Sequence, residues 1–246
     1  MRHPAPEPES PGKGHDVRGM FASIAPRYDL CNRLLSMGQD RRWRAALARQ
    51  LPELRAGDRL LDLCTGTGDV ALELARGAGP EVHVHGGDFC EAMVTLAPDK
   101  ARRLSQPPPS FHVSDAQALP FADGSFRAVT VAFGLRNVEQ PAQGLAEMAR
   151  VLEPGGRLLI LEFGRPQNRV FAALYRFYFF KILPRVGRML SRSEVDAYGY
   201  LPESVWAFFG PAELSTRMQA LGLEPLQIRP FLGGAVLLFV AEKRRP

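Results

Sequence analysis

Cysteine is scarce in this chain of 246 residues. Cys31, Cys64 and Cys90 form no C-x-x-C spacing, which argues against a disulfide framework and against a cysteine-based zinc site. His83 and His85 share one face of a predicted strand, but no third ligand follows at a suitable spacing. We therefore expect both histidines to be structural and expect no metal. A reducing, cytoplasmic setting is the default for such a chain.

Long apolar runs and the common hydrolytic motifs are also missing. No stretch approaches the ~20 apolar residues that cross a bilayer, and no signal-peptide core occurs near the start. The chain has no nucleophile elbow, no phosphate loop that ends in Gly-Lys-Ser/Thr and no paired-carboxylate motif. The sequence therefore predicts no membrane span. It also gives no support for a serine hydrolase, a P-loop nucleotide-binding protein or an enzyme that acts through paired carboxylates.

The charge balance is mildly basic, with a net charge of +5 and a pI of about 9.4. This balance suits a nucleic acid, an anionic membrane surface or no particular partner, so the distribution of charge decides. Arginines concentrate at residues 41–44 and between residues 165 and 192, where they alternate with large apolar side chains. So apolar a surface offers few phosphate contacts, and we expect no nucleic-acid partner.

The order of the predicted elements indicates one α/β domain. Residues 1–16 are rich in Pro, Glu and Ser, which predicts a disordered leader, and residues 17–246 form a single domain that begins with helices over 17–55. The predicted strands cover residues 59–64, 82–87, 111–113, 126–133, 158–163, 223–228 and 235–242. Alternation with helices predicts a mostly parallel sheet with helices on both faces. The last two strands are joined by a short turn, so we expect an antiparallel C-terminal edge.

The run LLDLCTGTGD, residues 60–69, places a glycine turn between a buried strand and a helical pattern. Such turns hold nucleotide-like cofactors, and Gly66 and Gly68 permit a tight turn and a close approach of the ligand. The loose G-x-G-x-x-G/A pattern fits a dinucleotide, but Asp69 would repel its pyrophosphate. S-adenosylmethionine instead offers an ammonium and a sulfonium, for which Asp62 or Asp69 is a favourable partner, although Asp69 can also cap the helix. The methyl donor is therefore favoured.

Acidic residues also follow the second and third predicted strands. Asp88 lies 20 positions beyond the second turn glycine, where a carboxylate accepts both hydroxyls of a ribose in either cofactor. The alternative role for Asp88 is to cap the next helix, and the two roles are compatible. Asp115 and Ala116 follow the third strand, where the carboxylate can accept from the adenine amine and the backbone N–H can donate to the ring.

Two features beyond the fourth strand bear on the substrate. Arg136 and Asn137 either orient an oxyanion, or pair with a carboxylate and cap a turn. Residues 165–205 are unusually aromatic and basic, as either an ordinary amphipathic helix on the sheet or a lid over the active site. An apolar lid with arginines suits a greasy substrate that arrives from a membrane surface. We therefore expect peripheral contact with the inner face of the membrane.

Longer motifs resemble one methyltransferase family. They are residues 28–32, the segments LDLCTGTGD, ALPFADGSF and FGLRNV, residues 150–157, and DAYGYLPESV. From about Val17 to the C-terminus, the chain resembles the ubiquinone/menaquinone biosynthesis C-methyltransferases. These are S-adenosylmethionine-dependent enzymes of the Rossmann-like class I fold.

The resemblance also implies which residues contact the cofactor. Thr67, Asp88, Asp115 and Ala116 match cofactor-contacting positions of the family. Ala132 matches another, but the family often has Ser there, so Ala132 would act through its backbone. Asp40 stands where the family commonly has His.

The reaction implied by the resemblance is C-methylation of a polyprenylated quinol. The acceptor is demethylmenaquinol, or alternatively a methoxy-polyprenyl-benzoquinol of ubiquinone biosynthesis; a more distant alternative is an NAD-dependent oxidoreductase. A ring carbon becomes nucleophilic when a neighbouring hydroxyl loses its proton, so the enzyme must deprotonate, align and exclude water. We expect Arg136 to stabilise the oxyanion and Tyr28, Tyr198 or Tyr200 to lie near the substrate, with the base unidentified. No metal is required, because the leaving group is a neutral thioether.

Overall fold

The computed structural model describes residues 13–102, 107–191 and 197–245. The side chains at positions 13–16, 188, 190, 191, 197 and 198 are also outside this description. The predicted leader, residues 1–16, therefore lies outside the described residues except for the backbone of the first helical turn.

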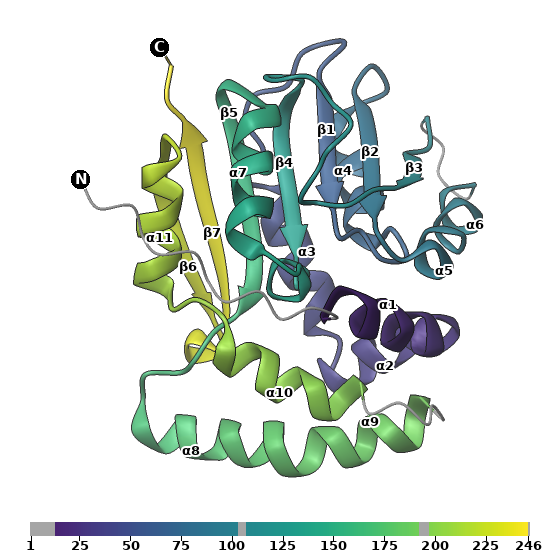
Figure 1. Cartoon of the computed structure of the whole chain (residues 1–246), viewed down its shortest axis with the longest axis vertical. Coiled ribbons are helices and arrows are strands. Elements are labelled where there is room, and N and C mark those ends of the chain that lie inside the picture. Colours follow the sequence, from purple (N-terminus) through teal and green to yellow (C-terminus); the bar gives the residue numbers. More distant parts are fainter. Residues whose placement is uncertain (1–12, 103–106, 192–196, 246) are drawn as a thin grey trace.

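A seven-stranded sheet forms the middle of the molecule, in the order β3-β2-β1-β4-β5-β7-β6 (Figure 1). Its strands are β1 (Arg59–Leu63), β2 (His83–Asp88), β3 (Ser110–Val113), β4 (Phe126–Ala132), β5 (Leu152–Phe163), β6 (Leu223–Phe231) and β7 (Val236–Lys243). The first five strands pair in parallel, whereas β7 runs antiparallel to both of its neighbours. This topology confirms the predicted α/β class, the mostly parallel sheet and the antiparallel C-terminal edge.

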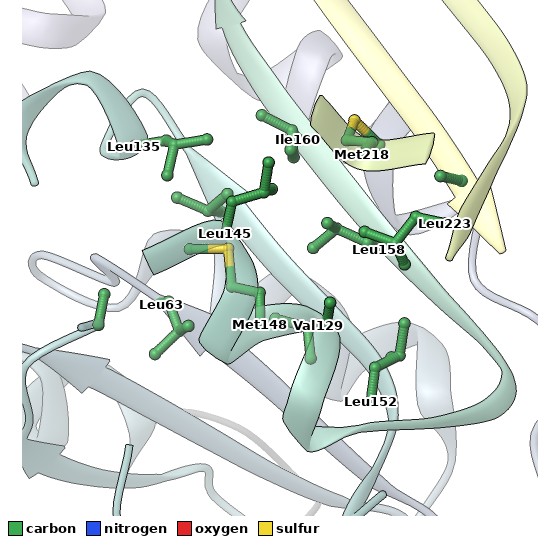
Figure 2. Packing of buried hydrophobic residues seen from close by; sticks show 14 of the residues in the cluster. Leu63, Val129, Leu135, Leu145, Met148, Leu152, Leu158, Ile160, Met218 and Leu223 are labelled. Atoms are coloured by element: carbon green, nitrogen blue, oxygen red, sulfur yellow. The ribbon is translucent and has the colours of Figure 1, made fainter. Parts of the chain in front are cut away.

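Helices cover both faces of the sheet. On one face, α7 (Pro141–Val151) and α11 (Pro211–Ala220) bury Leu145, Met148 and Met218 against β4 and β5 (Figure 2). On the other face, α3 (Gln39–Ala48) and α4 (Asp69–Ala78) bury Trp43 and their aliphatic side chains against β1 and β7. The central strands are buried on both sides, because helices cover both faces.

A third apolar cluster lies beyond the ends of the parallel strands. It joins α1 (Lys13–Ile24) and α2 (Tyr28–Leu35) to α9 (Leu183–Ser191), α10 (Ala197–Ala207) and the short helix α5 (Glu91–Val94). The helix α8 (Arg169–Phe177), the π-helical turn η3 (Tyr178–Ile182) and α9 form one long rod along the lower edge of Figure 1. This rod contributes Phe179 and Leu183 to the cluster. Segments that are far apart in the sequence therefore build one cap over the strand ends. The remaining helical elements are η1 (Ala25–Arg27), α6 (Ala97–Ala101), η2 (Leu135–Asn137) and η4 (Leu232–Gly234).

The start of β5 differs from the prediction. The Glu-Pro-Gly-Gly run after α7 predicts a turn and a strand from Leu158, yet β5 already begins at Leu152. The register with β4 shifts there, because Phe126 pairs with Leu152 but Ala128 pairs with Arg157. The predicted turn thus lies as an irregularity inside the strand, with Gly155 at φ +78°. A Cβ on Gly156 would lie 2.8 Å from the carbonyl oxygen of Arg127, so only glycine permits this close approach of the strands.

Candidate functional site

The carboxyl ends of the parallel strands face α1, α2 and α10 (Figure 1). The turn after β1 lies at this edge, with Gly66 at φ +56° and Gly68 at φ +84°, where glycine is favoured. A Cβ on Gly68 would lie 2.8 Å from the ring of Phe111, so this glycine serves packing against β3. Gly66 instead lines a cavity, so the predicted close approach of a ligand concerns Gly66 alone.

The first cavity measures about 270 Å³ and lies along the ends of β1, β2 and β4. Five of the residues expected to bind a cofactor line it: Gly66, Asp88, Asp115, Ala116 and Ala132. Tyr28, which was expected near the substrate, lines the same cavity from the N-terminal helices. The structure therefore brings together side chains from positions 28 to 132 at one edge of the sheet.

Asp88 is held in place by the backbone. Its carboxylate accepts from the N–H of Gly66 at 2.8 Å and from the N–H of Cys90 at 2.9 Å. Burial raises the pKa of Asp88, and these backbone N–H groups offset part of the rise. Asp88 therefore fixes the glycine turn and the start of the next helix while it faces the cavity.

Two buried polar atoms at the first cavity have no partner among the described residues. They are the hydroxyl Oγ of Ser114 and the amide Oδ1 of Asn137. Unsatisfied buried polar atoms are rare in folded proteins, so a ligand or water is expected to satisfy these two. Ser114 was not among the expected site residues, although its place directly before Asp115 at a strand end is a usable signal.

Three further residues that we expected at the cofactor do not line the cavity. Gly68 packs against β3, as described above, and Asp62 is buried below the turn. Asp62 accepts from the hydroxyls of Thr65 and Thr130, each at 2.6 Å. Thr67 donates to Asp29 at 2.6 Å and accepts from Lys100 at 2.7 Å, so it ties α2 and α6 to the turn.

Asp69 is neutralised by two cations. Its carboxylate pairs with Arg44 at 3.1 Å and with Lys100 at 3.0 Å. Burial alone would raise the pKa of Asp69, but these two cations hold it below its ordinary value. The predicted repulsion of a pyrophosphate by Asp69 is therefore weakened, and this residue does not separate the two cofactors.

A second, larger cavity of about 410 Å³ adjoins the first. Its walls are mostly apolar and aromatic, and they come from α1, α2, α3 and the rod formed by α8, η3 and α9. Phe21, Tyr28 and Phe133 line both cavities, so these three side chains form the boundary between them. Phe21 carried no signal in the sequence, because only the packing of α1 brings it to the strand ends.

Arg136 lines the second cavity as part of a buried ion pair. Its Nη1 donates to Oε1 of Glu162 at 2.8 Å and also to the carbonyl oxygen of Phe133, while its Nε donates to Ser204 at 3.3 Å. The side chains of Arg136 and Glu162 are 7% and 2% exposed. The predicted alternative of a carboxylate partner for Arg136 is thus observed, and the charged group still reaches the cavity wall.

The three tyrosines expected near the substrate differ in their position relative to the two cavities. Tyr28 is partly buried at the boundary of the two cavities, and the desolvation of its hydroxyl raises its pKa. Tyr200 lines the second cavity. Tyr198 belongs to α10, but its side chain lies outside the described residues.

Family comparison agrees with this arrangement. A model of the ubiE/COQ5 methyltransferase family matches residues 10–243. The chain belongs to this family. Membership supports a methyl donor and leaves the dinucleotide alternative without support.

Curated relatives are similar over most of their length. The chain is 48% identical to a demethylmenaquinone methyltransferase of Deinococcus radiodurans, with 94% of each chain covered. It is 49% identical to a demethylmenaquinone methyltransferase of Thermus thermophilus, over 82% of this chain and 90% of the relative. A ubiquinone/menaquinone biosynthesis C-methyltransferase of Geobacter sulfurreducens is 44% identical, over 94% of this chain and 90% of the relative.

Solved structures share the fold at low sequence identity. A SAM-dependent methyltransferase from Aquifex aeolicus superposes with a TM-score of 0.63 at 19% identity, over 90% of this chain and 97% of that one. A SAM-dependent methyltransferase from Thermotoga maritima gives a TM-score of 0.63 at 18% identity, over 93% and 100%. These similarities show the class I methyltransferase fold.

The buried carboxylate below the turn predicts a pH-dependent stability. Burial raises the pKa of Asp62 from 3.8 to about 7, so the native state keeps a proton that the unfolded state loses above about pH 4. The wild type should therefore lose stability relative to Asp62→Asn as the pH rises from 5 to 8, by an amount on the order of 3 kcal/mol. Urea unfolding of both proteins across this range measures the difference.

The exposed Asp99 provides the matched control, because Asp99→Asn removes a carboxylate at the surface. That variant should track the wild type at every pH. A constant difference between Asp62→Asn and the wild type would contradict the raised pKa of Asp62.

Proposed function

We propose that the protein transfers a methyl group from S-adenosylmethionine to a ring carbon of a polyprenylated quinol. The observation that carries this proposal is the pair of adjoining cavities with Phe21, Tyr28 and Phe133 between them. One cavity is lined by carboxylates and unsatisfied polar atoms, and the other by aromatic and aliphatic side chains. The first cavity suits a polar, cationic methyl donor, and the second suits a prenylated ring.

The residues of the first cavity fit the methyl donor. Asp88 would accept the ribose hydroxyls, Asp115 and the backbone of Ala116 would hold the adenine, and Gly66 would allow close approach. Ala132 offers only its backbone, and Asp62 and Thr67 would support the turn from below. When bound, the donor supplies an electrophilic methyl group on a sulfonium.

The second cavity supplies the remaining tasks of the reaction. Its apolar walls exclude water from the ring, and Tyr28 lies where the two ligands would meet. Arg136 stabilises the negative charge that develops on the ring oxygen, because its cation lies at the wall of an apolar space. Tyr198 remains a candidate substrate contact on α10.

The identity of the ring follows from the relatives only in part. Two of them are named demethylmenaquinone methyltransferases, which favours demethylmenaquinol as the acceptor. Others carry a name that covers both ubiquinone and menaquinone biosynthesis. A methoxy-polyprenyl-benzoquinol of ubiquinone biosynthesis is therefore the second candidate.

The first test is direct methyl transfer. The purified protein, with labelled S-adenosylmethionine and chemically reduced acceptors under anaerobic conditions, should label demethylmenaquinol more efficiently than the benzoquinol. Calorimetry should detect binding of S-adenosylmethionine and none of NAD. Labelling of neither quinol would overturn the proposed function, and tight NAD binding alone would restore the dinucleotide alternative.

The second test addresses Arg136. Removal of its charge would leave Glu162 unpaired in the core at a cost of about 3–5 kcal/mol, so Arg136→Lys is more informative than Arg136→Ala. Lysine keeps the charge but lacks the planar set of donors, so turnover should fall by about 10-fold to 100-fold with nearly unchanged affinity for the methyl donor. Single-turnover rates and calorimetry measure the two quantities. Arg150→Lys, on the face away from the cavities, is the control, and unchanged turnover in Arg136→Lys would refute the role.

We further propose that the mouth of the second cavity rests on the inner face of the membrane. Met37, Phe171, Leu174 and Leu232 line the cavity and are all exposed to solvent, at 78%, 36%, 63% and 47%. Between positions 164 and 193 the sequence contains seven basic residues and no acidic residue. An apolar rim with basic flanks suits an anionic bilayer, from which a prenylated quinol can enter. None of the described helices has the length and apolar character needed to cross a bilayer.

Vesicle binding tests this orientation. Val170 and Phe177 are 72% and 60% exposed on α8 beside the mouth. The double change Val170→Ser and Phe177→Ser should weaken binding to anionic vesicles at least about tenfold, because each lost apolar contact is worth about 1.5–3 kcal/mol when fully inserted. Leu226→Ser with Ile228→Ser, on the exposed β6, is the matched control. Equal vesicle binding by both double variants would contradict the proposed docking face.

A further inference from the structure

The proposed reaction needs a proton acceptor, and the wall of the second cavity is poor in bases. Among the described residues that line it, the carboxylate is that of Asp40, and no histidine is present. Both oxygens of Asp40 are occupied, because Oδ1 accepts from Ser36 at 3.0 Å and Oδ2 pairs with Arg44 at 2.5 Å. Each oxygen of Asp40 therefore already has a partner, one of them a cation, which makes Asp40 a weak base.

Glu162 does not line the second cavity, but it is hydrogen-bonded to two residues that do, Arg136 and Phe163. Unlike Asp40, it has one oxygen without a partner among the described residues. Its Oε1 accepts from Arg136 and from the N–H of Phe163, each at 2.8 Å. Its Oε2 is buried and has no partner among the described residues. A buried carboxylate oxygen without a donor is costly unless something else satisfies it, so this atom requires an explanation.

A second unsatisfied oxygen, the hydroxyl of Tyr200, lies within electrostatic reach of this carboxylate. The side chain lines the second cavity, and its hydroxyl is also buried without a partner among the described residues. Burial raises the pKa of Tyr200, while Arg136 lowers it and Glu162 raises it again, so both charged groups lie within electrostatic reach of the hydroxyl. One unsatisfied oxygen thus belongs to this ion pair, and the other lies within its electrostatic reach.

We propose that Glu162 accepts the proton of the quinol hydroxyl and that the Tyr200 hydroxyl relays it from the cavity. This inference rests on the proposed function and names the base that the reaction lacks. Arg136 has two roles in this arrangement: it positions the carboxylate through Oε1, and it faces the oxygen that becomes negative.

The proton balance closes with water as the final acceptor. The O–H bond of the quinol breaks, and its proton moves to the oxygen of Tyr200. The proton of Tyr200 moves through a bridging water to Oε2 of Glu162, because these two oxygens are not hydrogen-bonded to each other. The electron pair stays on the ring, so the new carbon–carbon bond can replace the carbon–sulfur bond of the donor. The ring C–H proton then leaves to water, and the ring oxygen regains its proton from Glu162 through Tyr200. One proton is released for each methyl group transferred.

The groups that face Glu162 determine the pH at which it can act. Burial raises the pKa of Glu162, and Arg136 together with the N–H of Phe163 offsets part of the rise. Cys64, Tyr175 and Tyr200, on other elements, also lie within electrostatic reach of this carboxylate, which raises the pKa of each. Because only the ionised carboxylate can accept a proton, kcat/KM should rise with pH through the pKa of Glu162 and then level off.

The test is Glu162→Gln, which keeps an acceptor for Arg136 but removes the base. With a short-chain demethylmenaquinol, kcat should fall about 100-fold while KM and the affinity for S-adenosylmethionine stay within about threefold. The rising limb of the pH profile should disappear. The deficit should shrink for a ring-fluorinated analogue, because its more acidic hydroxyl needs less help from a base.

Glu147→Gln is the matched control. Glu147 is also paired with an arginine, Arg150 at 2.7 Å, but on α7 away from both cavities. This variant should keep the wild-type kcat and pH profile.

A purely structural role for Glu162 gives different results. It predicts that Glu162→Gln loses the same factor in kcat with the demethylmenaquinol and with its fluorinated analogue, that its pH profile is unchanged, or that its kcat stays within about fivefold of the wild type. Any of these outcomes overturns the inference. If Glu162→Gln does not fold, Tyr200→Phe takes its place. It should lower kcat about tenfold with little change in KM, and full activity in that variant would also overturn the relay. Failure of the wild type to methylate any quinol would instead refute the proposed function itself.

Discussion

Parallel pairing of β1 to β5 is the constraint on which the site depends. Strands that run in the same direction end at the same edge, so the residues that follow them meet even when they are far apart in the chain. Asp88 after β2, Asp115 after β3 and Arg136 after β4 reach this edge for that reason. The antiparallel β7 contributes no such strand end, and its pairing with β5 instead sets Leu237 opposite Glu162.

The cap over this edge separates two kinds of environment. The N-terminal helices and the segment from α8 to α10 pack on each other through one apolar cluster, and the second cavity lies beneath them. The first cavity remains polar, because the loops after the strands supply carboxylates and backbone N–H groups. Phe21, Tyr28 and Phe133 mark the change from one environment to the other. A reaction between a charged donor and an apolar ring needs this kind of boundary.

The sequence predicted the parts of the site that depend on local patterns. The succession of strands and helices along the chain, the glycine turn and the acids after β2 and β3 follow from periodicity and from position relative to strand ends. Roles set by distant partners were not predictable in this way. Thr67 and Asp69 lie in the turn, yet Lys100 on α6 determines what their side chains do. Likewise, the motif predicts the turn conformation of Gly68, but it does not predict that Phe111 on β3 leaves no room for a Cβ at this position.

The role of Glu162 also depends on a distant partner and could not be predicted from local sequence. Glu162 is the one charged residue of the apolar run 158–163, but the role of that charge appears only when Arg136 approaches from η2. A buried ion pair gives little net stability, because desolvation of two charges offsets most of their attraction. A pair that serves folding alone would also be expected to satisfy all of its oxygens, as Asp40 does with Ser36 and Arg44. Glu162 leaves Oε2 without a donor beside an apolar cavity, and this cost is best explained by a proton that arrives with the substrate.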